Sequence, residues 1–200
     1  RRDMRFYAKL AHCNISIVNQ IKPMGVADAV SLARDFVGNT PFVCIMPDCL
    51  LFSKTTFARQ LMDGFEHCRK NIIGTVIVQG VDVGRFGNVG KLRTNRLDDR
   101  YFSITSLSAK SQGPLTTGFG EKIHKGFGGG IYLPEYFDLV EIIRHQARGE
   151  VDDVPIHHRL IEKGALMGVF LEGNAFDAGH PLGYRAAVHF AGRPNVNYRS

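Results

Sequence analysis

The sequence contains no hydrophobic run long enough to cross a membrane as a helix, which takes about 18 consecutive apolar residues. Its richest apolar stretch, residues 42–52, is interrupted by Pro47 and Asp48. The chain also opens without an initiator Met and without an apolar segment shaped like a signal peptide. We therefore expect no membrane-spanning segment and no membrane partner.

Cysteine is scarce, and its spacing suggests neither a zinc site nor a redox motif. The four cysteines are Cys13, Cys44, Cys49 and Cys68, and none of them forms a CxxC pair. Three of the four lie in apolar surroundings, where a reduced thiol behaves as a small hydrophobe. This usage predicts a reduced, cytoplasmic protein.

Motifs of covalent catalysis and of common phosphate loops are missing as well. The sequence has no GxSxG, and no Cys, His and acidic residues stand at the spacing of a catalytic nucleophile and its base. Residues 128–130 are three consecutive glycines, but they lack the GxGxxG or GxxxxGK[ST] arrangement. This glycine run is more typical of a bulge or a close backbone approach than of a phosphate loop.

What is present suits one globular domain over residues 1–200. Apolar residues make up 44% of the 200 residues and charged residues 22%, with no internal repeat and no linker-like stretch. The net charge of +6 favours an anionic partner. Because the basic residues do not form a stripe with aromatics between them, a small anionic ligand is favoured over nucleic acid.

Apolar periodicity alternates between strand-like and helix-like segments. This alternation predicts an α/β fold with a mixed, mostly parallel sheet. A helix capped by Ser53 should carry Phe57, Leu61 and Phe65 on one face. Residues 111–130 are Gly-rich and predicted to be irregular. The predicted strands are 14–18, 42–46, 72–78, 84–91, 101–108 and 166–171, and the other predicted helices are 26–36, 134–145, 156–163 and 183–190.

Two aspartates are candidate metal ligands, because ligands of open α/β sheets bind beyond the carboxyl ends of strands. Asp48 follows the apolar run 42–46, and Asp177 lies between the strand-like segment 166–171 and the last predicted helix. Carboxylates placed this way suit Mg²⁺. Each aspartate also has a structural alternative as a helix cap or turn residue.

Three further polar positions are candidates. In the loop 20–25, Gly25 would let a base or phosphate approach the backbone before a helix. Lys110 follows a predicted strand in a Gly-flanked region and is a candidate phosphate ligand, with an ordinary solvated lysine as the alternative. His157 and His158 are adjacent and therefore point to different faces of a helix, so we expect surface or partner-facing residues and not a metal pair.

Taken together, these segments resemble the bacterial UTP-glucose-1-phosphate uridylyltransferases, a family of sugar-phosphate nucleotidyltransferases. The resemblance runs from about residue 15 to residue 192 and depends on several motifs that occur in the same order. These motifs are Gln20 with Gly25, Pro41-Phe42-Val43 to Met46-Pro47-Asp48, Arg85-Phe86-Gly87, Ile104 to Lys110, Pro134 to Asp138, Gly149-Glu150, and Phe176-Asp177-Ala178-Gly179 with Leu182-Gly183-Tyr184. The fold implied is a Rossmann-like, GT-A-like three-layer fold.

The resemblance also implies an activity: UTP and a hexose 1-phosphate, expected to be glucose 1-phosphate, would give a UDP-sugar and pyrophosphate. Asp48 and Asp177 would bind the catalytic Mg²⁺, and Lys110 would orient the attacking phosphate as the catalytic residue. The implied nucleotide-binding residues are Gln20, Gly25, Asp48 and Gly87, and the implied sugar-binding residues are Gly87, Glu150 and Lys110. A homo-oligomer is possible by the same resemblance.

The sequence departs from the family pattern at its start and near the sugar site. The Gly-Thr-Arg loop that cradles the triphosphate in the family has no counterpart here. Ala109 stands where a sugar-binding Glu is expected, and His180-Pro181 replaces an Asn/Ser-Lys pair. We therefore expect the C-terminal two-thirds of the family fold, N-terminally incomplete and inactive by itself. The alternative is a non-catalytic module of the same fold that binds a nucleotide sugar or has a regulatory role.

Overall fold

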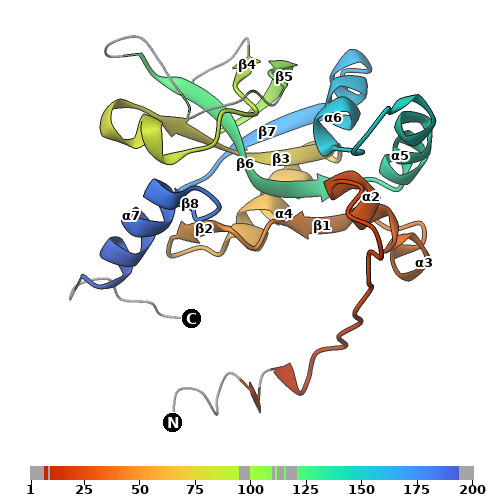
Figure 1. Ribbon diagram of the computed structural model, residues 1–200, viewed down its shortest axis with the longest axis horizontal. Helices are drawn as coiled ribbons and strands as arrows, with labels where there is room; N and C mark the ends of the chain where they lie inside the picture. Colours follow the sequence, from red (N-terminus) through yellow and green to blue (C-terminus); the bar gives the residue numbers. More distant parts are fainter. Residues whose placement is uncertain are drawn as a thin grey trace.

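A six-stranded sheet forms the centre of the molecule (Figure 1). The computed structural model describes residues 7, 8, 10–94, 100–109, 111, 115 and 121–193. The strand order is β1-β6-β3-β7-β5-β4. The strands are β1 (Phe42–Ile45), β3 (Asn71–Val78), β4 (Leu92–Thr94), β5 (Tyr101–Leu107), β6 (Ile123–Tyr132) and β7 (Leu166–Phe170).

The sheet is mixed, as the sequence predicted. Strands β1, β3, β4 and β7 run in one direction, and β5 and β6 run in the other. The predicted parallel character therefore holds for strand direction, but within the described residues β3 and β7 are the only parallel neighbours. Antiparallel neighbours arise because β6 lies between β1 and β3, and β5 lies between β7 and β4.

Helices cover both faces of this sheet, because the strands alternate apolar side chains between two cores. On one face, α2 (Val26–Ser31), α5 (Glu135–Gln146) and α6 (Asp153–Glu162) pack on Ile73, Phe102 and Tyr132. On the other face, α4 (Phe57–Cys68) packs on Ile72, Val76 and Val169. The result is the three-layer arrangement expected from the sequence.

The apolar side chains at every fourth position of α4 form its buried stripe, as predicted, but a different residue caps the helix. Phe57 and Leu61 are buried, and Phe65 packs against the same core. Thr56, and not Ser53, is the N-cap, and its hydroxyl accepts a hydrogen bond from the Arg59 N–H at 3.3 Å. Ser53 lies too early because the chain first completes a strand.

That strand, β2 (Cys49–Phe52), pairs antiparallel with β8 (Asn174–Asp177) in a separate two-stranded sheet. The helix α7 (Pro181–Ala191) follows β8 directly and starts with Pro at its first position. Gly183 lets α7 approach the backbone of Asp177 and Arg85, which a Cβ at this position would meet. This small unit places Asp48 and Asp177 beside each other.

Three predicted segments differ in the structure. Residues 14–18 form no strand and expose Ile15 and Ile17, because no neighbouring strand pairs with them among the described residues. The segment 84–91 begins in the 3-10 helix η1 (Gly80–Arg85) and contains no strand. The Gly-rich segment 111–130 is not irregular throughout, since residues 123–130 belong to β6.

Strand β6 tolerates its glycines because the neighbouring backbones lie too close to them to admit a side chain. A Cβ at Gly130 would meet the Ile72 carbonyl of β3, and one at Gly129 would meet the Cys44 carbonyl of β1. Glycine therefore lets three backbones approach closely in the middle of the sheet.

None of the described helices is long and apolar enough to cross a membrane.

Candidate functional site

The two aspartates singled out in the sequence lie side by side. Cys49 and Asp177 are register partners of the β2–β8 pair, and Asp48 directly precedes Cys49. The Ala178 N–H donates to the backbone carbonyl of Asp48 at 2.7 Å, which joins the two segments. Asp48 is exposed and Asp177 is half-buried. We call Asp48, Asp177, Gly87 and Gly179 the carboxylate site.

The carboxylate of Asp177 is held in a fixed orientation. Its Oδ2 accepts a hydrogen bond from the Gly87 N–H at 2.8 Å, so the loop after η1 anchors one oxygen. The other oxygen, Oδ1, faces Gly179 together with Oδ2 of Asp48. A Cβ added to Gly179 would lie 3.3 Å from Asp177 Oδ1 and 2.6 Å from Asp48 Oδ2. Glycine at position 179 therefore leaves space where two carboxylate oxygens converge.

This donor set fits Mg²⁺, which binds through one or two carboxylates and completes its shell with waters and substrate phosphates. No cluster of three or more His, Cys, Asp or Glu side chains suited to a metal occurs among the described residues. A site with only two protein carboxylates thus depends on its ligand for the remaining oxygens.

Sequence reasoning missed a buried lysine near this site. Lys125 of β6 is 4% exposed, and its Nζ donates to the Val89 carbonyl at 2.6 Å. Burial lowers the pKa of Lys125, while Asp177 and Cys49 act in the opposite direction. The residue went unnoticed because it stands in the Gly-rich segment that was expected to be irregular.

Cys49 lies beside the carboxylate site but is not a nucleophile. Burial, with Asp48 and Asp177 adding to it, raises the pKa of the Cys49 thiol to about 12. At neutral pH the side chain is therefore a protonated thiol, which is the unreactive form. All four cysteines are free in the structure.

The other predicted nucleotide-binding segment, the loop before α2, is occupied by the chain itself. Gly25 has φ +103°, and a Cβ there would lie 2.5 Å from the Val151 carbonyl oxygen. That carbonyl accepts hydrogen bonds from the N–H groups of Ala27 at 3.0 Å and Asp28 at 3.3 Å. The glycine thus serves a close approach, as predicted, but the group that approaches in the structure is Val151.

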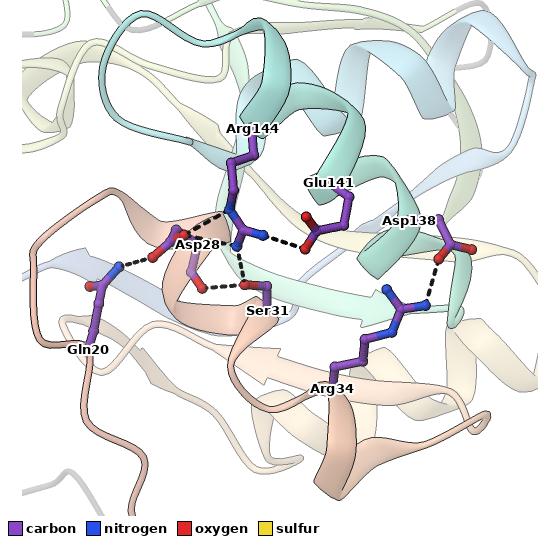
Figure 2. Close-up of polar contacts among 7 residues, drawn as sticks. All are labelled: Gln20, Asp28, Ser31, Arg34, Asp138, Glu141 and Arg144. Atoms are coloured by element: carbon purple, nitrogen blue, oxygen red, sulfur yellow. Dashed lines mark hydrogen bonds and ion pairs between the residues drawn. The ribbon is translucent and has the colours of Figure 1, made fainter.

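Gln20 joins the same loop to a polar network that we call the clamp, formed by Gln20, Asp28, Ser31, Glu141 and Arg144 (Figure 2). The Gln20 amide donates to Asp28 Oδ2 at 2.7 Å and to the Gly25 carbonyl at 3.2 Å. Arg144 of α5 donates to Asp28 Oδ1 and Ser31 Oγ and also contacts Glu141. The hydrogen bond from Gln20 and the charge of Arg144 lower the pKa of Asp28.

The remaining predicted residues have separate positions. Glu150 is exposed and precedes Val151, so it belongs to the clamp end of the molecule. Lys110 lies outside the described residues.

The prediction of surface histidines is wrong for His157, which is buried with its Nε2 2.8 Å from the Tyr132 hydroxyl. His158 is half-buried, and its Nε2 lies 2.7 Å from the Leu107 carbonyl. The rings of both histidines of α6 therefore lie against the sheet, at Tyr132 of β6 and Leu107 of β5.

An open groove of about 1250 Å³ lies between η1, α7 and the segment joining β7 to β8. Arg85, Phe176, Tyr184 and His189 are among its lining residues, whereas Asp48 and Asp177 are not. This groove is therefore next to the carboxylate site but distinct from it.

The chain matches no protein-family model, but it is similar to curated proteins. It is 28% identical over 179 residues to a UTP-glucose-1-phosphate uridylyltransferase of Staphylococcus epidermidis, covering 89% of this chain and 60% of the relative. A protein of the same name from Bacillus subtilis is 26% identical over 171 residues, which cover 86% of this chain and 56% of that protein. The chain thus spans somewhat more than half the length of these curated relatives.

Solved structures show the same fold. A UDP-glucose pyrophosphorylase complexed with UDP-glucose superposes with a TM-score of 0.76 at 18% identity, covering 95% of this chain and 71% of that one. A UTP-bound UGPase from Acinetobacter baumannii gives a TM-score of 0.67 at 19% identity, over 98% of this chain and 69% of that one. These similarities confirm the nucleotidyltransferase-type fold that the sequence motifs implied.

Proposed function

We propose that this chain carries the metal-binding and nucleotide-sugar-binding part of an enzyme that forms UDP-glucose and pyrophosphate from UTP and glucose 1-phosphate. One observation carries the proposal: Asp48 and Asp177, which are distant in sequence, direct carboxylate oxygens to the same point above Gly179. The names of the curated relatives and the UDP-glucose and UTP bound in the similar structures support the same substrates.

The reaction is an in-line transfer in which a sugar phosphate oxygen attacks the α-phosphorus of UTP and pyrophosphate leaves. Such chemistry needs positioning and neutralisation of charge more than a covalent protein group. A bound Mg²⁺ would supply that neutralisation on the phosphate oxygens. Asp48 and Asp177 would hold the metal, and the Gly87 N–H would keep Asp177 in the required orientation.

The clamp supplies the second part of the proposed site. Gln20 and Gly25 are the residues that the family resemblance assigns to the nucleotide, and Glu150, assigned to the sugar, is adjacent to Val151 in sequence. Because Gln20 donates to Asp28, its position is set by Arg144 through a chain of hydrogen bonds. In the proposal, Lys110 meets the phosphate of the sugar.

The decisive experiment is calorimetry of UDP-glucose binding with and without Mg²⁺. Asp48→Asn should weaken Mg²⁺-dependent binding by roughly 100-fold, since a carboxylate a few ångströms from a cation contributes several kcal/mol near a protein surface. The fold should persist, because β2 and β8 are joined through the backbone carbonyl of Asp48. Asp35→Asn, an exposed aspartate of α3 (Arg34–Val37), is the matched control and should bind as the wild type does. Unchanged binding by Asp48→Asn would exclude the metal assignment.

A non-catalytic module that binds a nucleotide sugar is the second candidate. It is favoured by Ala109, which stands where the family resemblance expects a sugar-binding Glu and offers no side-chain oxygen. Release of pyrophosphate from UTP and glucose 1-phosphate separates the two functions. Measurable release by this chain supports the enzyme. Because the chain is expected to be inactive by itself, binding without release supports the module only where the binding of UDP-glucose does not depend on Mg²⁺.

A further inference from the structure

The least expected ionisable group of the molecule is the ammonium group of Lys125. This lysine shares a face of β6 with Ile123 and Phe127, both of which belong to the apolar core under α4. Lysine side chains are almost never fully buried unless they are paired, because an ion loses its hydration in the interior. A lysine that is 4% exposed at this position therefore requires a specific reason.

The partner of Lys125 is neutral. Its Nζ donates to the Val89 carbonyl at 2.6 Å, and among the described residues no carboxylate lies within ion-pair distance of it. The positive charge is consequently bound in place but not cancelled by a direct ion pair.

Two connections link this charge to the carboxylate site. Val89, which accepts from Lys125, is two residues from Gly87, whose N–H binds Asp177. A Cβ on Gly128, three residues after Lys125, would lie 3.0 Å from the Cβ of Cys49, so β6 touches the start of β2 next to Asp48. Lys91 stands opposite Lys125 across an isolated bridge, and it adds a second basic residue at this end of β6.

We propose that Lys125 is a specificity-determining residue that biases the carboxylate site against a bare divalent cation and toward a metal accompanied by an anionic phosphate. The ligand identity in this statement rests on the proposed function. A fixed positive charge repels a cation bound at Asp48 and Asp177 and attracts a phosphate bound there. Metal and nucleotide would then bind together and not one by one.

This electrostatic role predicts effects of opposite sign on two ligands. Removing the charge should strengthen binding of the metal alone and weaken binding of the nucleotide sugar alone, each by about fivefold, allowing for screening by solvent and salt. A purely structural role, in which Lys125 only supports the loop 86–90, would instead weaken binding of both ligands. The sign of the metal effect therefore separates the two roles.

The experiment compares the wild type with Lys125→Met and Lys125→Gln. Met matches the length of the stem without charge, and Gln retains an N–H donor for Val89, which guards against loss of the loop structure. Calorimetry measures Mn²⁺ alone, and then UDP-glucose in the presence of a chelator. The matched control is Lys70→Met, since Lys70 also donates to a backbone carbonyl, that of Gly164 at 3.1 Å, but is exposed.

Tighter Mn²⁺ binding together with weaker UDP-glucose binding in both Lys125 variants, and no change in Lys70→Met, is the expected result. Mn²⁺ binding that is unchanged or weaker in the Lys125 variants would overturn the proposal. Failure of the wild type to bind UDP-glucose, with or without metal, would refute the proposed function instead, and the Mn²⁺ comparison would still decide the role of Lys125.

Discussion

The carboxylate site and the clamp contain similar groups, but their carboxylates differ in how many hydrogen bonds they accept from the chain. A glycine lies where chain segments meet in both regions, Gly25 beside the clamp and Gly179 in the carboxylate site. Aspartate side chains and backbone N–H groups lie near each of them. In the clamp, both oxygens of Asp28 accept hydrogen bonds, from Gln20 and from Arg144. At the carboxylate site, Asp177 accepts one from Gly87, and no described residue donates to the carboxylate of Asp48.

This difference indicates which of the two regions is suited to a metal ion. A network whose members satisfy one another rigidifies the fold, because its polar groups have partners within the chain. Carboxylates that converge without a protein cation between them repel each other unless a cation is supplied from outside. The clamp therefore fixes the position of Gln20, whereas the carboxylate site is the place where the proposed metal would add stability.

Substitutions of the glycines near the two regions test this difference most directly, and Gly25→Ala should have the largest effect. Gly25→Ala should lower the free energy of unfolding by roughly 3 kcal/mol, from backbone strain at φ +103° together with weakened hydrogen bonds to Val151. Chemical denaturation measures the change. Gly38→Ala is the control, because Gly38 also has a positive φ of +60° but no atom lies within 4 Å of the added Cβ. Equal losses in both variants would show that the contact with Val151 contributes nothing.

Gly179→Ala should have the opposite pair of effects, with little change in stability and weaker ligand binding. The added Cβ meets the carboxylate of Asp48 at 2.6 Å and that of Asp177 at 3.3 Å, and its three nearest atoms all belong to side chains, so stability should change by less than about 0.5 kcal/mol, as for most surface substitutions. The displaced carboxylate should weaken Mg²⁺-dependent UDP-glucose binding by about tenfold, in the range seen when groups that orient metal ligands are lost. Gly149→Ala, with open space around its Cβ, is the control for both measurements. A large loss of stability with intact binding would contradict the contrast.

The sequence made Asp48 and Asp177 candidate metal ligands, because Asp48 follows the apolar run 42–46 and Asp177 lies between the strand-like segment 166–171 and the last predicted helix. Their role as metal ligands stays a prediction. Their pairing through β2 and β8 could not be predicted, since strands of four residues carry too few positions for a periodic signal. The strand pattern of residues 14–18 was misleading, because alternation describes a strand only where a neighbour pairs with it. Lys125 was missed because its segment is rich in glycine, which in a sequence is typical of an irregular loop. In the structure these glycines instead admit close backbones beside a strand.

The smallest effect is expected in the clamp from Asp28→Asn. The pKa of Asp28 is lowered in the folded protein, so its ionised form contributes stability above its ordinary pKa of about 3.9, and this contribution is lost as the pH falls through the lowered value. The substitution should therefore cost about 1 kcal/mol at pH 7, a modest value for a partly exposed pair, and less at pH 3. Denaturation at the two pH values measures this difference.

Asp138→Asn is the matched control for this last prediction, because Asp138 binds Arg34 at 2.7 Å with 66% of its side chain exposed, beside the clamp in Figure 2. Its ion pair should contribute less than about 0.5 kcal/mol, since exposed pairs are screened by water and salt. Neither substitution touches the carboxylate site, so Mn²⁺ binding should stay unchanged in both. An Asp28→Asn variant that loses Mn²⁺ binding would show that the clamp and the carboxylate site are one coupled unit.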